Sequence, residues 1–164
     1  MQAKDYKRWT KPLRDHPRFS ECLLAANKAL TYLGYAIYPL LLVALAALND
    51  PLLMRAIIVP ATGFVLVSAL RRIANKPRPY EALDIDPLIK KDTHGKSFPS
   101  RHAFSMTMIA MTWLAWCQPV GICLLAASLA MGAVRVLGGV HYPIDVAAGI
   151  TIAVLLGIVG YFVL

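Results

Sequence analysis

Two histidines in this chain have neighbours suited to chemistry, and the first lies at the start of an apolar stretch, K-S-F-P-S-R-H-A-F-S-M-T-M (Lys96–Met108). Pro99 and Ser100 precede the apolar residues, so Ser100 can cap a helix that begins there. The free N–H groups and the dipole at such a helix end attract an anion, phosphate above all. His102 falls in the first turn, beside any bound anion. An interfacial histidine without a task is the alternative, and it explains less of the pattern.

The second histidine lies in V-R-V-L-G-G-V-H-Y-P-I-D-V-A-A-G (Val134–Gly149), between two apolar runs. His141 falls in the turn, and Asp145 follows it by one helical turn, so the carboxylate can reach an imidazole nitrogen. A carboxylate in this place fixes the tautomer and raises the basicity of the other nitrogen, which makes the histidine a nucleophile. Without such a role, a charged Asp145 within a membrane helix would cost about 2.5 kcal/mol or more. Small residues recur at every fourth position after Asp145. They predict a helix face suited to close packing against another helix, with the Asp145 carboxylate pointing into the bundle.

A third cluster, R-R-I-A-N-K-P-R-P-Y (Arg71–Tyr80), is rich in cations. Taken alone, these cations are best explained as anchors at a membrane surface. Arg78 is different, because a proline on each side stiffens the backbone and holds the side chain in place.

The elements that must position these residues are membrane helices. Of the 164 residues, 58% are hydrophobic and 16% are charged, whereas a soluble domain is roughly half apolar and about a quarter charged. A span needs about 20 apolar residues, with roughly 17 as the lower limit. The apolar runs are 30–48, 51–70, 103–117, 120–137 and 143–164. Four reach the limit, and the third does so if it begins at Phe98. We predict an all-α polytopic bundle of about five transmembrane helices, with a basic arm at 1–29 and a membrane domain at 30–164.

The arm contains a short apolar stripe between basic residues, R-F-S-E-C-L-L-A-A-N-K (Arg18–Lys28). It predicts an interfacial helix, since it is too short to span; a solvated basic tail is an equally good interpretation. The cysteines Cys22, Cys117 and Cys123 are too few and too scattered for a disulfide framework or a zinc site. No grouping of Cys and His has zinc-ligand spacing, and we expect no metal and no cofactor.

The basic residues are distributed unevenly, and this predicts a topology. Seven of the 17 lie in the arm, eight lie from Arg71 to Arg101, and only Arg55 and Arg135 remain. An odd number of spans puts the arm and the 71–101 segment on one face. By the positive-inside rule this face is cytoplasmic, in the cell membrane.

The three clusters, in this order, resemble the motifs of the type 2 phosphatidic acid phosphatases. That family's pattern is Lys-x6-Arg-Pro, then Pro-Ser-Gly-His, then Ser-Arg-x5-His-x3-Asp. Arg78, His102, Arg135, His141 and Asp145 occupy matching positions. The resemblance covers roughly residue 51 to the C-terminus.

Three positions depart from the family pattern. Arg71 replaces the lysine and keeps a cation, with a different donor geometry. Arg101 replaces the glycine of the second motif and can add a phosphate or head-group contact. Val134 replaces the serine of the third motif and removes one hydrogen bond. The usual membrane members also have six spans and an outward-facing site, so a five-span chain with a cytoplasmic site goes against the family expectation.

The resemblance implies phosphoryl transfer without a metal. His141 is the expected nucleophile, Asp145 holds its imidazole, and His102 protonates the leaving oxygen and later activates water. The residues expected to bind the phosphoryl oxygens are Arg71, Arg78, Ser100, Arg101 and Arg135.

The expected substrate is a lipid phosphate, because the pocket opens at the bilayer surface; no nucleic-acid partner is expected. Phosphatidic acid, phosphatidylglycerol phosphate, a polyprenyl phosphosugar and a polyprenyl diphosphate all fit. The loop Tyr80–Gly95 either helps to select the head group or is a solvated connector. A transferase or phosphatase of water-soluble phosphates, and a non-enzymatic membrane protein with a decayed site, are the alternatives.

Overall fold

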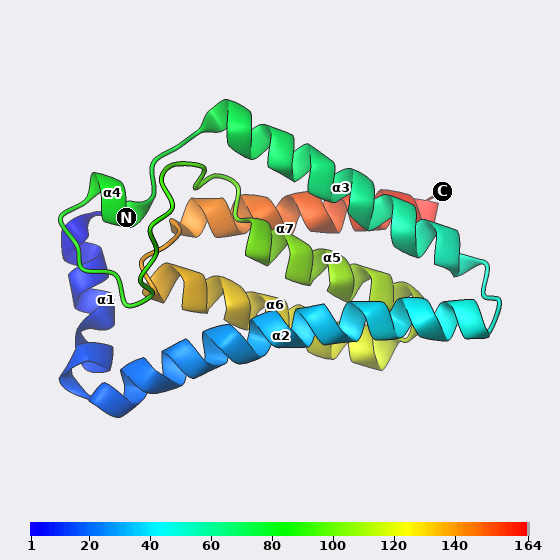
Figure 1. Cartoon of the computed structure of the whole chain (residues 1–164), viewed down its shortest axis with the longest axis horizontal. Helices are drawn as coiled ribbons and strands as arrows, with labels where there is room; N and C mark the ends of the chain where they lie inside the picture. Colours follow the sequence, from blue (N-terminus) through cyan, green and yellow to red (C-terminus); the bar gives the residue numbers. More distant parts are fainter. Residues whose placement is uncertain (164) are drawn as a thin grey trace.

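The computed structural model describes residues 1–163, and within them it contains helices and loops but no strand (Figure 1). The expectation of an all-α helix bundle is confirmed. The helices are α1 (Ala3–Asp15), α2 (Pro17–Ala47), α3 (Leu52–Ala74), α4 (Pro79–Ala82), α5 (Arg101–Trp116), α6 (Gln118–Leu137) and α7 (Pro143–Ile158), and α7 continues as one π-helical turn, η1 (Val159–Val163).

Four helices of the described chain are long and apolar enough to cross a membrane: α2, α3, α6 and α7. The fifth expected span, α5, has 16 residues, which at about 1.5 Å per residue is shorter than a hydrocarbon core of about 30 Å. It begins at Arg101 rather than Phe98, because the F-P-S segment before it belongs to a loop. Nine of its residues are buried, so neighbouring helices shield much of it from lipid.

Helix α5 lies in the middle of the bundle and packs against α2, α3, α6 and α7. Its contact with α7 depends on small residues. A Cβ on Gly149 would come 2.5 Å from the carbonyl oxygen of Ser100, and one on Gly157 would come 2.8 Å from the Cβ of Met111. Only glycine permits this approach, so the packing face predicted from the four-residue repeat after Asp145 is confirmed.

Helices α1 and α4 and the long loop after α4 gather at one end of the bundle, while the turn between α2 and α3 lies at the other end (Figure 1). The stretch Arg18–Lys28 forms the first part of α2, which begins 13 residues before the apolar run at Leu30. The separate helix of the arm is α1, which is joined to α2 at His16. The end with α1 and the loop is also where α5 and α7 begin and α3 and α6 end.

Candidate active site

The site is built where the loop after α3 returns into the bundle. Helix α3 ends at Ala74 and is capped by Asn75, which adopts the left-handed conformation with φ of 36°. The backbone N–H of Ser97 then donates to the carbonyl oxygen of Lys76 at 2.9 Å, and that of Ser100 donates to the carbonyl oxygen of Asp145 at 2.8 Å. These two bonds fix the Ser97–Ser100 segment against α3 and α7.

A buried triad lies at the start of α7. The Nδ1 atom of His141 is 3.5 Å from Oδ2 of Asp145, and the two side chains are 3% and 1% exposed. Between them lies the hydroxyl of Ser97, which donates to Oδ2 of Asp145 at 2.5 Å and lies 3.4 Å from Nδ1 of His141. The N–H of Tyr142 gives Asp145 another bond, at 3.0 Å. Because Nδ1 faces the carboxylate, Nε2 is the nitrogen left for a substrate.

The electrostatic setting of His141 favours a neutral ring. Burial, and then the positive charges of Arg78 and Arg71, lower the pKa of His141 to about 4, although the hydrogen bond with Asp145 opposes this change. A histidine with this pKa keeps its lone pair at neutral pH, which a nucleophile requires.

Two arginines are held in place by backbone carbonyls. Arg71 donates to the carbonyl oxygens of Pro99 at 2.6 Å and Ser97 at 3.4 Å. Arg78 donates to those of Gly95 at 3.1 Å and Val140 at 3.5 Å. Both side chains are buried. These bonds fix the two guanidinium groups beside His141, and within residues 1–163 neither forms an ion pair with a carboxylate, so both can bind an anion.

Glu81 organises this part of the loop. Its carboxylate accepts hydrogen bonds from the N–H of Arg78 at 2.6 Å and from the N–H of Gly95 at 2.9 Å. It also lies 3.0 Å from Nδ1 of His94. Glu81 thereby ties the start of the loop to its end and keeps the backbone carbonyl of Gly95 where Arg78 needs it.

Two further candidates are buried with polar atoms that have no partner in the described part of the chain. Arg135 is 2% exposed and its Nε makes no hydrogen bond there. Ser100 takes the N-cap position of α5, but its hydroxyl caps nothing and is also without a partner. The predicted capping bond is wrong, since the N-terminus of α5 is packed against α7. Buried donors without a partner are expected at a site where a bound anion would accept their hydrogen bonds.

Arg101 and His102 lie apart from the triad, at the cavities of the molecule. Arg101 is exposed and stands over the ring of Phe64, 5.4 Å from its centroid. A polar cavity of about 690 Å³ lies on one side of Arg101, lined by α3 and the loop, with the guanidinium groups of Arg71 and Arg78 in its wall. An apolar groove of about 300 Å³ lies on the other side, and it contains His102.

The apolar groove runs between α2, α5 and α6. Its walls are mainly aliphatic and aromatic, and Gly34 of α2 widens it. The remaining lining residues are Leu30, Thr31, Tyr35, Phe64, Ser105, Met106, Ile109 and Met131. Because α2 presents most of its surface outward, the groove is open to the side of the bundle where lipid would lie.

The structure brings all eight predicted residues to one end of the bundle. His141, Asp145, Arg71, Arg78, Arg135 and Ser100 are buried together, and Arg101 and His102 stand at the cavity walls. Sequence reasoning missed Ser97, which lies 48 positions from Asp145. The only signal for Ser97 was its place just before the P-S-R-H motif. The part played by Glu81 in holding the loop was also missed.

Comparisons with known proteins find a family and several relatives for this chain. A family model described as the PAP2 superfamily matches residues 52–163. Undecaprenyl-diphosphatase BcrC of Bacillus subtilis is 30% identical over 95 residues, covering 58% of this chain and 49% of the relative. Bacitracin transport permease protein BcrC of Bacillus licheniformis is 29% identical over 108 residues, covering 65% and 53%. The chain thus spans about half the length of these two relatives.

Two solved structures share the fold over most of their length. Aquifex aeolicus LpxE superposes with a TM-score of 0.72 and 29% identity, covering 88% of this chain and 86% of the other. A transmembrane PAP2-type phosphatidylglycerolphosphate phosphatase from Bacillus subtilis gives a TM-score of 0.64 and 26% identity, covering 88% and 76%. Because the family model matches more than half of its residues, the chain belongs to the PAP2 superfamily.

Proposed function

We propose that this protein is a membrane phosphatase that hydrolyses a lipid phosphate or a polyprenyl diphosphate through a phosphohistidine. The observation that carries the proposal is the His141–Asp145 pair, with Nδ1 and Oδ2 3.5 Å apart, buried beside guanidinium groups that form no ion pair within residues 1–163. Such a constellation supplies a nucleophile and a binding site for a phosphoryl group in one place.

In the first step, Nε2 of His141 attacks phosphorus with its lone pair, and the bond from phosphorus to the lipid oxygen breaks. His102 gives a proton to that oxygen, so the lipid leaves as an alcohol or, from a diphosphate, as a monophosphate. His102 then takes a proton from water, whose oxygen attacks the phosphohistidine. The products are inorganic phosphate and free His141.

The arginines stabilise the charge of the transferred group. Arg71 and Arg78 are held by backbone carbonyls, so they need little reorganisation when charge develops on the phosphoryl oxygens. Arg135 and Ser100 offer the buried donors that have no partner in the described residues. We propose the same role for Arg101 at the cavity wall.

The apolar groove supports a substrate with a lipid tail. It reaches His102 and Arg101, so a chain lying there would put its phosphate end next to the general acid. The names of the relatives point to the same class, with an undecaprenyl diphosphatase and a phosphatidylglycerolphosphate phosphatase among them. A water-soluble phosphate ester would not need the apolar walls of the groove.

We also propose that the reaction needs no metal ion. In residues 1–163, no three His, Cys, Asp or Glu side chains come close enough together to hold one, and the cationic side chains supply the positive charge. Full activity in EDTA is the expected result; a loss that one divalent ion restores would refute this part.

The test of the function is phosphate release by the purified protein in detergent with EDTA present. The panel contains a phosphatidic acid, a phosphatidylglycerol phosphate, a polyprenyl diphosphate and sugar phosphates. Release from the lipids with little from the sugar phosphates supports the proposal. Faster release from the sugar phosphates would favour the water-soluble alternative, and transfer to an added alcohol would show a transferase.

We propose that the active site faces the cytoplasm of the cell. Helix α1 contacts the loop beyond α4 through Arg14 and Asp86, so the basic arm and the site lie on the same face, and this face carries most of the positive charge. Roughly 1 kcal/mol per basic residue near anionic lipid favours the cytoplasmic leaflet.

Sidedness is tested by cysteines placed singly in a variant without Cys22, Cys117 and Cys123. Lys4→Cys and Ala82→Cys should resist an impermeant thiol reagent in intact cells, whereas Leu48→Cys, in the turn after α2, should react. The opposite pattern would reverse the orientation.

A further inference from the structure

Two adjacent lysines of the loop point in different directions. The side chain of Lys90 is 75% exposed and forms an ion pair with Asp86. Lys91 is half-buried and lies among the arginines of the site. Both residues are lysines, so the difference in their exposure comes from how the loop packs against the rest of the protein.

The loop is docked onto the turn between α6 and α7. The N–H of Ile89 donates to the carbonyl oxygen of Gly138 at 3.0 Å, and the Ile89 side chain is buried. A Cβ on Gly138 would collide with this side chain, so only glycine allows the contact. Gly138 lies one turn beyond Arg135 on α6, and Lys91 follows two residues after Ile89. The docking therefore brings the Lys91 ammonium toward the Arg135 guanidinium.

The charges of Lys91 and Arg135 act on each other, and neither side chain forms an ion pair with a carboxylate of residues 1–163. Burial, and then the positive charges of Arg135, Arg78, Arg101 and Arg71, lower the pKa of Lys91 to about 8. The Nε of Arg135 is buried without a hydrogen-bond partner in the described residues. Desolvated like charges and an orphaned donor are unfavourable by themselves, and one anionic oxygen would relieve both.

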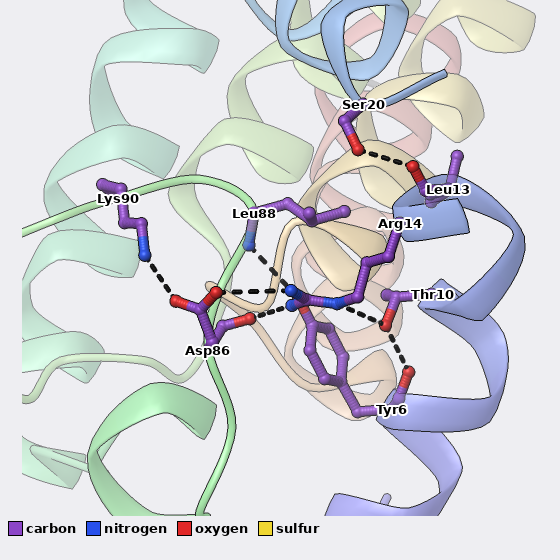
Figure 2. Close-up of polar contacts among 8 residues, drawn as sticks. All are labelled: Tyr6, Thr10, Leu13, Arg14, Ser20, Asp86, Leu88 and Lys90. Carbon is purple, nitrogen blue, oxygen red and sulfur yellow. Dashed lines mark hydrogen bonds and ion pairs between the residues drawn. The ribbon is translucent and has the colours of Figure 1, made fainter. Parts of the chain in front are cut away.

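Helix α1 holds the loop in this docked position (Figure 2). The hydroxyl of Tyr6 accepts a hydrogen bond from the N–H of Leu88 at 3.3 Å. Arg14 donates to the backbone oxygen of Asp86 and also to its carboxylate, the latter at 3.3 Å. Tyr6 is 1% exposed, and its ring lies against Gly139 in the same turn that receives Ile89. The arm, the loop and the turn thus form one packed unit.

We propose that Lys91 is an additional phosphate-binding residue, which shares an anionic substrate oxygen with Arg135 and is positioned by the contact of α1 with the loop. This inference rests on the proposed function for its substrate. The oxygen belongs either to the phosphoryl group that is transferred or to a second phosphate of the head group. Lys91 has no counterpart in the three motifs that the chain shares with its family.

The first experiment compares Lys91→Met with Lys90→Met, which removes the neighbouring exposed charge and leaves Arg14 paired with Asp86. We expect Lys91→Met to lower kcat/KM by tenfold or more, which is the usual effect of losing a charged hydrogen bond. Lys90→Met should stay within about twofold of wild type, and Lys91→Arg should recover most of the loss. Equal values for the Lys91→Met and Lys90→Met variants would overturn the proposal.

Calorimetric binding of inorganic phosphate to the detergent-solubilised protein makes the test independent of turnover. A weaker Kd in Lys91→Met than in Lys90→Met supports the inference even if none of the lipids tested is a substrate. If wild type hydrolyses lipid phosphates and both variants bind phosphate like wild type, the inference is wrong and the proposed function stands. If wild type neither hydrolyses lipids nor binds phosphate, both are wrong.

The pH dependence of phosphate affinity distinguishes a phosphate-binding lysine from a merely structural one. The charged and titratable groups facing Lys91 are Arg135 from α6, Arg71 from α3, Arg78 from the segment before α4, and Arg101 and His102 from α5. The arginines keep their charge to high pH, while Lys91 loses its proton above about pH 8. Phosphate affinity of wild type should therefore fall between about pH 8 and 9.5, and Lys91→Arg should flatten this fall. A fall of the same size in Lys91→Arg would count against the proposal.

Substrates with one and two phosphates identify which oxygen is bound. An equal loss in Lys91→Met for a lipid monophosphate and a polyprenyl diphosphate assigns Lys91 to the transferred phosphoryl group. A loss confined to the diphosphate assigns it to the second phosphate. Both results support a phosphate contact, whereas a loss for neither would overturn it.

The positioning role of α1 is tested by a double-mutant cycle. Arg14→Met should raise KM several-fold with little change in kcat, and Lys11→Met, exposed on the same helix, should not. In the Lys91→Met background the effect of Arg14→Met should disappear, because the two residues act through one contact. Additive effects would show that α1 does not work through Lys91.

Discussion

The two cavities beside Arg101 differ in construction as well as in chemistry. The polar cavity of about 690 Å³ is lined largely by the loop and the C-terminal half of α3, and it holds guanidinium groups fixed by backbone carbonyls. The apolar groove of about 300 Å³ is lined mainly by apolar side chains of α2, α5 and α6, with Arg101 and His102 at the start of α5. Arg101 and Phe64 belong to both walls.

This difference implies a division of labour. Charged groups within a bilayer are costly and usually mark a functional site, which is why we propose that the phosphoryl group is bound beside Arg71 and Arg78. Apart from Arg101 and His102 at its end, the groove is lined mainly by apolar side chains, and we expect these to bind an apolar chain. Changes on the polar side should therefore affect every substrate, whereas changes in the groove should affect only those with a tail.

The largest effect is expected from His141→Ala. Removing the proposed nucleophile should lower kcat by at least about 10³-fold for lipid and short-chain phosphates alike, since no other group near phosphorus can form the covalent intermediate. Phosphate release measured in detergent checks this, with the melting temperature as evidence of folding. His16→Ala, which alters an exposed histidine of the arm, is the matched control. Near-normal turnover without His141 would remove the mechanism.

A pH profile examines the same residue without a mutation. The folded-state pKa of His141 is lowered to about 4, below the ordinary value of about 6.5. Its active, neutral form should therefore persist as the pH falls, and kcat/KM should drop about tenfold per unit only below about pH 4. Because His141 is the proposed nucleophile for every substrate, this limb should be the same for lipid and short-chain substrates. A limb near pH 6.5 would show that the ring is not held neutral.

The sequence predicted the fold class, and it suggested candidate site residues that the structure brings together, because both depend on local patterns. Long apolar runs identify spans without any tertiary information, and the His141–Asp145 pair lies within one helical turn. The bounds of the short α5 were harder to predict, because they depend on contacts with other helices. Its N-terminus packs against Gly149 of α7, and this contact, rather than the limit of the apolar run, sets where the helix begins.

What the sequence did not reveal depends on long-range contacts. Ser97 reaches Asp145 across 48 positions, and Lys91 differs from Lys90 only because Ile89 docks on Gly138. The capping role expected for Ser100 failed for a similar reason. The hydroxyl is buried against a neighbouring helix rather than left free to turn toward its own.

A smaller effect is expected from filling the groove at Gly34. A Cβ there would lie 3.5 Å from Sδ of Met106 and 3.7 Å from the Ile109 side chain, so Gly34→Ala should be tolerated. Gly34→Leu should occupy the groove and lower kcat/KM for long-chain substrates by about tenfold, a loss of about 1.4 kcal/mol of apolar contact. Short-chain phosphates should react at the wild-type rate. An equal loss for both would show that the groove does not hold the chain.

The smallest effect on kcat/KM is expected from changes to Arg101, which lies at the boundary between the two cavities. Its guanidinium is 5.4 Å from the centre of the Phe64 ring and is exposed, so its charge should contribute modestly, roughly 0.5–1 kcal/mol or a two- to fivefold change in kcat/KM. Arg101→Met removes the charge and keeps the stem, whereas Arg101→Gly removes both and joins the two cavities.

The two Arg101 variants should therefore separate charge from shape. If Arg101 acts only as a phosphate contact, both should lose the same two- to fivefold for every substrate. If its stem also divides the cavities, Arg101→Gly alone should change the preference between long and short chains, because a chain could then pass beside Phe64 into the polar side. Ratios of kcat/KM over a series of chain lengths measure this. Wild-type ratios and rates in both variants would show that Arg101 neither binds the head group nor separates the two cavities.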